Sequence, residues 1–184
     1  TLIFASNGIT GDNTDGTGLV QDLTTNLGTV ITGRRVLLLG AGGAARGALG
    51  PLLAEKPALL VLANRTAAKA EALAEHFAAD GPVEGCGLTA LAGCHFDLVI
   101  NATSASLGGE VPPLPADCYA PGALAYDMMY GKGDTAFLAA ARAAGVTRLA
   151  DGLGMLVEQA AEAFFVWRGV RPVTQPVLEA LRQP

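Results

Sequence analysis

The stretch "VLLLGAGGAARG", Val36–Gly47, decides the fold. Its apolar run ends at Gly40, and Gly40, Gly42 and Ala45 have the G-x-G-x-x-[G/A] spacing of a dinucleotide-binding loop. In such a loop Gly40 allows a tight turn out of a strand, Gly42 lets the backbone approach a pyrophosphate, and the small Ala45 lets the next helix pack on the sheet. The helix N-terminus also attracts phosphate. We therefore predict cofactor contacts from Gly40, Ala41, Gly42, Gly43, Ala44 and Ala45, the alternative being glycines that serve packing alone.

The end of the next apolar run, "ALLVLANRT" (58–66), indicates which dinucleotide is bound. Enzymes that use NAD usually place Asp or Glu here to bond the ribose 2′-hydroxyl, and a carboxylate would repel a 2′-phosphate. This chain has Asn64, Arg65 and Thr66 instead, followed by Lys69. Arg65 can pair with a phosphate, and Thr66 and Lys69 can add donors. The sequence thus predicts NADP, the alternative being that Arg65 is only a solvated charge.

Apolar runs alternate with helical patterns through the middle of the chain. This alternation predicts βαβ units and an α/β fold with a doubly wound, Rossmann-type parallel sheet. An amphipathic helix is expected over 66–78, with Thr66 at its N-cap, and a long helix over 152–169. The expected strands are 34–39, 58–66, 95–103, 123–130 and 147–151.

The composition limits the kinds of partner. The 184 residues suffice for one well-buried domain, and the net charge of −5, without a block of five like charges, argues against nucleic acid. No membrane span or signal peptide is found. The three cysteines lack CxxC spacing, which favours free thiols in the cytoplasm, and no metal set is expected. The chain begins with Thr1, so we expect a processed chain or a piece of a longer one.

The first sixteen residues differ from the rest. "TLIFA" and "ITGDN" flank Ser6-Asn7-Gly8, and Asn-Gly is a strong hairpin signal. The stretch "GDNTDG" (11–16) that follows is compatible with a surface turn, a metal loop or part of an active site. Calcium is disfavoured, because Gly11 falls at the first ligand position of an EF-hand register and Asp22 at the place of its bidentate Glu.

Six ordered motifs together resemble the shikimate dehydrogenase family over nearly the whole chain. They are "GDNTDG", "GAGGAARG", "ANRT", "INATS", "YDMMY" and "ADGLGMLVEQAA". The resemblance implies an NADP-dependent oxidoreductase that interconverts shikimate and 3-dehydroshikimate in aromatic amino-acid (chorismate) biosynthesis. It also implies that residues 1–16 end an N-terminal substrate domain that is missing, and that residues 17–184 form the NADP-binding Rossmann domain, C-terminal helices included.

The resemblance assigns roles to individual residues. Asp15 is the implied catalytic carboxylate and also binds shikimate, together with Tyr130 and Gln159. Gln159 lies on a small or apolar helix stripe and needs a polar partner, either a ligand or a neighbouring loop. Tyr130 can equally be a core aromatic residue. Further implied cofactor contacts lie at the ends of strands and at the start of the long helix: Asn64, Asn101, Thr103, Met128, Gly152 and Met155, although a pair of methionines is more often packing.

The chain departs from the family pattern in one respect. The family's catalytic lysine lies in the N-terminal domain, and Lys56, Lys69 and Lys132 do not occupy the corresponding motif. We therefore expect this chain alone to bind NADP without turnover. The alternatives are a quinate/shikimate dehydrogenase paralogue and a nucleotide-binding module without catalysis.

Overall fold

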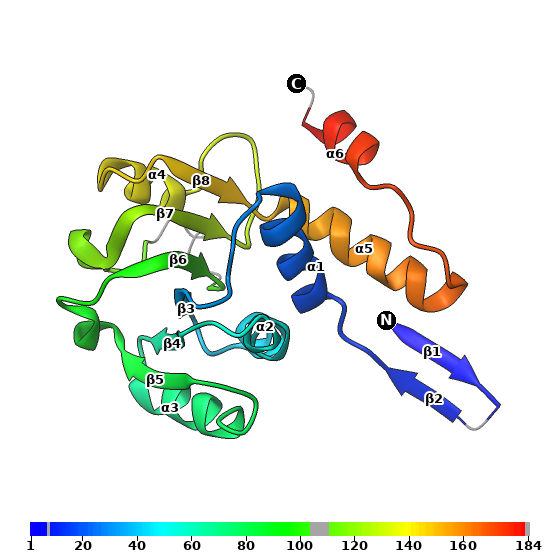
Figure 1. The fold of residues 1–184 in the computed structure, drawn as a ribbon, viewed down its shortest axis with the longest axis horizontal. Helices are drawn as coiled ribbons and strands as arrows, with labels where there is room; N and C mark the ends of the chain where they lie inside the picture. Colours follow the sequence, from blue (N-terminus) through cyan, green and yellow to red (C-terminus); the bar gives the residue numbers. More distant parts are fainter. Residues whose placement is uncertain (7, 104–110, 183–184) are drawn as a thin grey trace.

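A six-stranded parallel sheet forms the centre of the computed structural model, which describes residues 1–6, 8–103 and 111–182 (Figure 1). Its strand order is β5-β4-β3-β6-β7-β8, so the chain starts at β3 in the middle, fills one side, and crosses to β6 to fill the other. The sheet strands are β3 (Arg35–Leu39), β4 (Leu59–Asn64), β5 (Val83–Gly87), β6 (Phe96–Asn101), β7 (Tyr119–Asp127) and β8 (Arg148–Asp151).

Helices cover both faces of the sheet, which confirms the predicted doubly wound α/β fold. One apolar cluster joins the sheet to α1, α2, α3 and α5, and the other joins its opposite face to α4. The α-helices are α1 (Asp15–Gln21), α2 (Gly43–Ala54), α3 (Ala67–His76), α4 (Ala136–Ala143), α5 (Leu153–Arg168) and α6 (Gln175–Leu181). Shorter helical turns are η1 (Asp22–Asn26), η2 (Leu88–Leu91) and η4 (Ala116–Cys118).

The predicted strands and helices are present, with shifted ends. The expected strand over 123–130 ends at Asp127, so Met128 and Tyr130 lie in the loop beyond it. Helix α3 buries Ala70, Leu73 and Ala74 as its spacing predicts. Thr66 stands at the N-cap of α3, but its side chain makes no capping hydrogen bond.

Helix α1 and strand β5 were not predicted from the sequence. Both are rich in glycine, which has low propensity for helices and strands. In α1 these glycines allow close packing between helices. A Cβ on Gly16 would lie 2.2 Å from the carbonyl oxygen of Gly47 in α2, and a Cβ on Gly18 would lie 2.5 Å from the nitrogen of Gln159 in α5. Tertiary packing thus overrides the weak local propensity of this segment.

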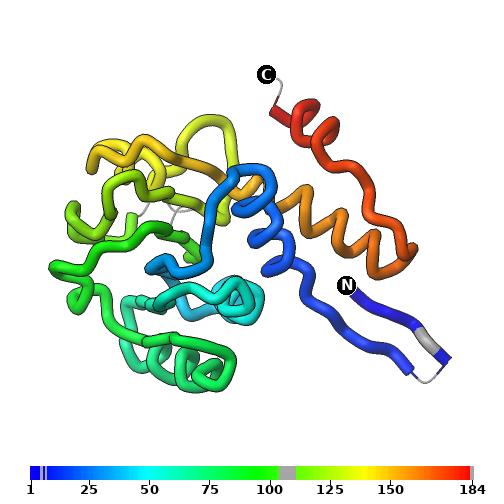
Figure 2. Tube along the Cα trace, in the orientation of Figure 1, coloured from blue at the N-terminus to red at the C-terminus, as the bar shows by residue number. Residues whose placement is uncertain are grey.

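The predicted hairpin is present as β1 (Leu2–Ala5) paired antiparallel with β2 (Gly8–Gly11); Asn7, in its turn, lies outside the described residues. The hairpin lies beside the end of α5, where the indole nitrogen of Trp167 donates to the carbonyl of Leu2 at 2.9 Å (Figure 2). We call residues 1–6, 8–11 and 164–182 the outer segment. Its exposed apolar side chains are Leu2, Phe4, Ile9, Phe164, Phe165, Trp167, Val170, Val173, Val177 and Leu181. The predicted division at residue 16 falls inside α1 and stays a prediction.

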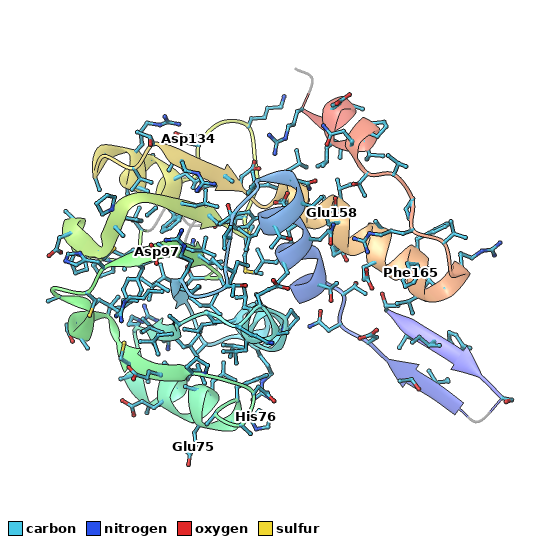
Figure 3. All side chains as sticks on the ribbon, viewed as in Figure 1. Glu75, His76, Asp97, Asp134, Glu158 and Phe165 are labelled. Atoms are coloured by element: carbon cyan, nitrogen blue, oxygen red, sulfur yellow. The ribbon has the colours of Figure 1, made fainter. Side chains whose placement is uncertain are left out.

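A buried polar network, which we call the junction, joins the sheet to the outer segment. The Tyr126 hydroxyl donates to Asp22 at 2.7 Å, and the Asn26 amide donates to Asp22 at 2.9 Å and to Glu158 at 3.2 Å. Glu158, labelled on α5 in Figure 3, also accepts from Thr174 at 2.7 Å and from Arg171 at 3.0 Å. Burial of Asp22 raises the pKa of its carboxyl above the ordinary value.

Other sequence expectations concern cysteines, metals and membranes. Cys86, Cys94 and Cys118 are free thiols. Within residues 1–6, 8–103 and 111–182, no group of three or more His, Cys, Asp or Glu side chains is arranged to hold a metal ion. None of the described helices is long and apolar enough to cross a membrane.

Candidate cofactor and substrate site

A cavity of about 710 Å³ opens at the carboxyl edge of the sheet. This volume lies in the range of small-molecule sites. Loops that follow β3, β4, β6 and β7 line it, together with Asp15 at the start of α1 and Met155 on α5. The centre of the cavity lies where the strand order reverses between β3 and β6, the place where open α/β sheets bind their ligands.

The predicted phosphate loop forms the middle of this cavity. Gly40 has a φ of +106°, a backbone conformation that favours glycine, and turns the chain out of β3. Gly42 and Gly43 have open space where a Cβ would stand, so a ligand can approach the backbone there. Gly40, Ala41, Gly42, Gly43 and Ala44 all line the cavity, whereas Ala45 is fully buried and packs α2 onto the sheet. Because α2 begins at Gly43, its first N–H groups have no partner within the helix.

One end of the cavity carries Asn64 and Arg65, which follow β4. The Asn64 amide donates to the carbonyl of Thr66 at 3.0 Å and shapes this turn. A second hollow of about 410 Å³ shares Ala41, Gly42 and Gly43 with the cavity and is lined by Arg46 and Lys69. Thr66 lines neither space. Arg46, Arg65 and Lys69 form no salt bridge with any other described residue, so the three charges are available to an anion.

The other end of the cavity carries Met128, Met129 and Met155. Since β3 and β6 separate β4 from β7, these methionines lie on the opposite side of the phosphate loop from Arg65. Gly152 lies beneath them: its N–H donates to the carbonyl of Met129 at 3.0 Å, and a Cβ there would meet the carbonyl oxygen of Met128 at 2.1 Å. Gly152 therefore brings the start of α5 against this loop without lining the cavity itself.

The polar residues of the stretch "GDNTDG" lie in three different environments. The Asn13 side chain accepts from the N–H of Asp15 at 2.9 Å and lies against Gly47 of α2. Thr14 is buried, and its hydroxyl lies 3.5 Å from the side-chain oxygen of Gln159. The Asp15 side chain is exposed and lines the cavity. The structure thus brings Asp15 together with the predicted cofactor loop.

The other predicted substrate residues lie near this cavity but do not line it. Gln159 is half-buried, and its neighbour Thr14 belongs to a loop, as one of the two sequence interpretations expected. Tyr130 is 49% exposed in the loop beyond β7, so it is not a core aromatic residue. Contacts of Gln159 and Tyr130 with a substrate stay predictions.

Thr103 lines the cavity, and Asn101 lies beneath it, fully buried at the end of β6. The amide oxygen of Asn101 accepts from the hydroxyl of Thr103 at 2.7 Å and from its N–H at 3.1 Å. Ser104, the last residue of "INATS", lies outside the described residues. The predicted direct contact between Asn101 and a cofactor stays a prediction.

Sequence reasoning missed several residues of the site. Arg46 follows Ala45 directly, and a survey of cations near the fingerprint could have found it. Met129 lies beside the predicted Met128. The others, on the cavity wall, carry no polar signal in the sequence: Leu39, Ala63, Leu88, Ala102, Val111, Pro112 and Pro113.

The strand order, together with the glycine loop at the point of reversal, defines the Rossmann class of dinucleotide-binding α/β proteins. Comparison with known proteins identifies the family. The family model described as Shikimate / quinate 5-dehydrogenase matches residues 22–108, and the one described as Shikimate 5'-dehydrogenase C-terminal domain matches residues 152–182. The chain belongs to the shikimate dehydrogenase family, which confirms the resemblance found in the sequence.

Individual relatives agree with this assignment. A protein of Dechloromonas aromatica named shikimate dehydrogenase (NADP(+)) is 64% identical over 182 residues, covering 99% of this chain and 66% of the relative. One of the same name from Aromatoleum aromaticum is 61% identical over 186 residues, covering 100% of this chain and 67% of the relative. A solved shikimate dehydrogenase in complex with NADP+ is 31% identical, with a TM-score of 0.80 over 98% of this chain and 64% of that one. The chain thus spans about two thirds of these relatives.

Proposed function

We propose that this chain is the cofactor-binding part of an enzyme that interconverts shikimate and 3-dehydroshikimate with NADP. The observation that carries the proposal is one cavity with the phosphate loop in its middle, Arg65 at one end, and Asp15 and methionines elsewhere on its wall. The relatives named shikimate dehydrogenase (NADP(+)) support it. They favour shikimate over a quinate-using paralogue and a catalytic role over a nucleotide-binding module.

The residues present fit a dinucleotide with a 2′-phosphate. The N–H groups at the start of α2 would hold the pyrophosphate over Gly42, where the backbone is open. Arg65 would pair with the 2′-phosphate, with Lys69 and Arg46 as further donors. A contact from Thr66, which lines neither space, stays a prediction from the sequence. Among the described residues, no Glu lines the cavity or the second hollow, and Asp15 is the only carboxylate that lines the cavity. The arrangement favours NADP over NAD.

When bound, NADP supplies a nicotinamide ring that accepts or returns hydride. An alcohol that loses hydride from carbon must also lose the proton of its hydroxyl group, and a carboxylate beside that group can hold the alcohol and share the proton. Asp15 lies on the wall of the same cavity as the phosphate loop, which supports this role. We assign it this role, with Tyr130 and Gln159 as further shikimate contacts. A lysine partner for Asp15, implied by the family resemblance, would come from outside these 184 residues.

The further third of the relatives' length would supply the rest of the substrate site as an N-terminal domain. The outer segment supports this proposal, because clustered exposed apolar side chains mark interaction surfaces. In this proposal the division of the chain lies at residue 16. We propose that the enzyme works in the cytoplasm without nucleic acid or membrane partners, in keeping with its free thiols and net charge of −5.

Cofactor choice tests the proposal first. Titration of NADP and NAD by calorimetry should show tighter binding of NADP by about 1–3 kcal/mol, the scale of a hydrogen bond to a charged group. Arg65→Ala should remove most of this preference. Arg168→Ala, an exposed arginine on α5, is the matched control and should keep it. An equal preference in wild type and Arg65→Ala would contradict the assignment of Arg65.

Turnover tests the second half of the proposal. The 184-residue chain, assayed by NADPH absorbance with saturating shikimate, should show no detectable activity, because orientation by the remaining substrate contacts is worth about 7–11 kcal/mol. Addition of the N-terminal third of the Dechloromonas aromatica relative should restore activity, and Asp15→Asn should then lower kcat sharply with little change in NADP affinity. Robust turnover by the chain alone would overturn this division of labour.

A further inference from the structure

A buried carboxylate, Asp127, lies at the end of β7 directly below the methionine end of the cavity. It is 0% exposed, and the register of the sheet places it between Asn101 on β6 and Asp151 on β8. Asn101 is itself paired with Leu39, the last residue of β3 before the phosphate loop. One row of residues therefore runs across the sheet directly beneath the site, and it changes from apolar at β3 to polar at β6 and β7.

Among the described residues, Asp127 accepts hydrogen bonds from three separate parts of the chain. Its Oδ1 accepts from the Asn101 amide at 3.0 Å and from the N–H of Met129 at 3.1 Å. Its Oδ2 accepts from the Thr135 hydroxyl at 2.5 Å. Thr135 is the N-cap of α4, and its hydroxyl oxygen also accepts from the N–H of Leu138 at 3.3 Å. The carboxylate thus joins the start of α4 to the ends of β6 and β7.

The bonds of Asp127 lead to the wall of the cavity by two short routes. One route is direct, because Met129 lines the cavity. The other passes through Asn101, whose amide donates to Asp127 while its oxygen holds the hydroxyl and the N–H of Thr103. Thr103 lines the cavity and lies against Gly40, where a Cβ would stand 3.2 Å from its methyl group. A change at Asp127 would therefore move this end of the cavity and leave the Arg65 end, beyond β3, in place.

We propose that Asp127 is a positioning residue for the nicotinamide half of the dinucleotide, acting through Met129 and through Asn101 and Thr103. The inference rests on the proposed function, since it needs the dinucleotide to lie across the phosphate loop with its 2′-phosphate at Arg65. It predicts that a substitution at Asp127 weakens binding of the nicotinamide half, at the methionine end, and leaves binding of the adenosine half unchanged. A purely structural role for Asp127 would weaken both halves alike.

Asp127→Asn tests the proposal, because an amide of the same shape can offer only one oxygen to three donors. The two ligands to be titrated are NADPH and adenosine 2′,5′-bisphosphate, which carries the 2′-phosphate but no nicotinamide. We expect NADPH affinity to fall about tenfold, the scale of one hydrogen bond to a charged group, together with a loss of the fluorescence change of bound NADPH. Affinity for adenosine 2′,5′-bisphosphate should change less than about twofold, well inside the scale of one such bond. Asp80→Asn, an exposed aspartate, is the control and should match wild type.

A second pair of variants covers the case in which Asp127→Asn does not fold. Thr135→Val removes the hydroxyl that donates to Asp127 and accepts from the Leu138 N–H, with little change of shape. It should give the same selective loss, about threefold, while Thr135→Ser keeps the hydroxyl and should match wild type. Unchanged NADPH binding in Asp127→Asn and Thr135→Val, or an equal loss for both ligands, would overturn the proposal. A wild-type chain that binds neither ligand would instead refute the proposed function, and this inference with it.

Discussion

The sheet and the outer segment are stabilised by different interactions. Strands β3, β4 and β6 are buried on both faces under helices, and their side chains are nearly all apolar. In the outer segment Phe4 is 73% exposed and Trp167 57% exposed, and the segment is tied down by polar contacts, chiefly those of Glu158 and the Trp167–Leu2 bond. Packing therefore stabilises the sheet, whereas the outer segment is held by a few hydrogen bonds and by the buried Leu178 of α6, and much of its apolar surface stays exposed.

Of the changes that distinguish the two regions, Gly18→Val in α1 should have the largest effect on stability. The new side chain would overlap the backbone of Gln159, and the two helices would have to move apart. We expect a loss of about 3 kcal/mol or more in the free energy of unfolding, measured by urea denaturation.

Gly11→Val in the hairpin is the matched control for Gly18→Val. A Cβ on Gly11 meets nothing within 4 Å, so this variant should lie within about 0.5 kcal/mol of wild type. Equal losses in the two variants would show that the outer segment is packed as tightly as the sheet region, contrary to the comparison.

A smaller effect is expected from Glu158→Gln in the junction. The replacement keeps the shape but removes the charge that Arg171 contacts, at a cost of about 2 kcal/mol. Hydrogen exchange should accelerate in residues 169–182 while β3 and β6 stay protected. Glu162→Gln is the control: this glutamate contacts the same arginine but is more exposed, so about 0.5 kcal/mol is expected. Unchanged exchange in Glu158→Gln would show that the junction does not hold the outer segment.

The smallest effect concerns pH and Asp22, which links the two regions. Burial raises the folded-state pKa of Asp22, so the folded protein binds more protons than the unfolded chain between the unfolded pKa, about 3.8, and the folded one. The contribution of Asp22 to stability therefore falls as pH rises through this window and is lowest above it. Urea denaturation of wild type and Asp22→Asn from about pH 4 to neutral should show wild type losing stability relative to the variant. A difference that is flat or opposite in sign would contradict the assignment.

The sequence was informative where one local signal has one structural meaning. The apolar run that ends in glycine predicted β3 and the phosphate loop, and the position directly after β4 predicted that Arg65 lies at the cavity. Both predictions depend only on residues that are adjacent in sequence. Helix α1 could not be predicted, since its glycines are explained only by α2 and α5, which are distant in sequence. The buried network at Asp127 was missed for a related reason: its partners come from other elements, and neither spacing nor composition reveals them.

The contact between α1 and α5 has a kinetic consequence. The first helix of the chain meets the helix that follows the last strand, and Thr14 and Gln159, which lie 145 residues apart in sequence, are neighbours there. Closing so long a loop costs more entropy than pairing β3 with β4, whose paired residues lie much closer in sequence. We therefore expect this helix pair to dock after the folding transition state, so that changes at Gly18 or Thr14 mainly accelerate unfolding and leave the folding rate nearly unchanged.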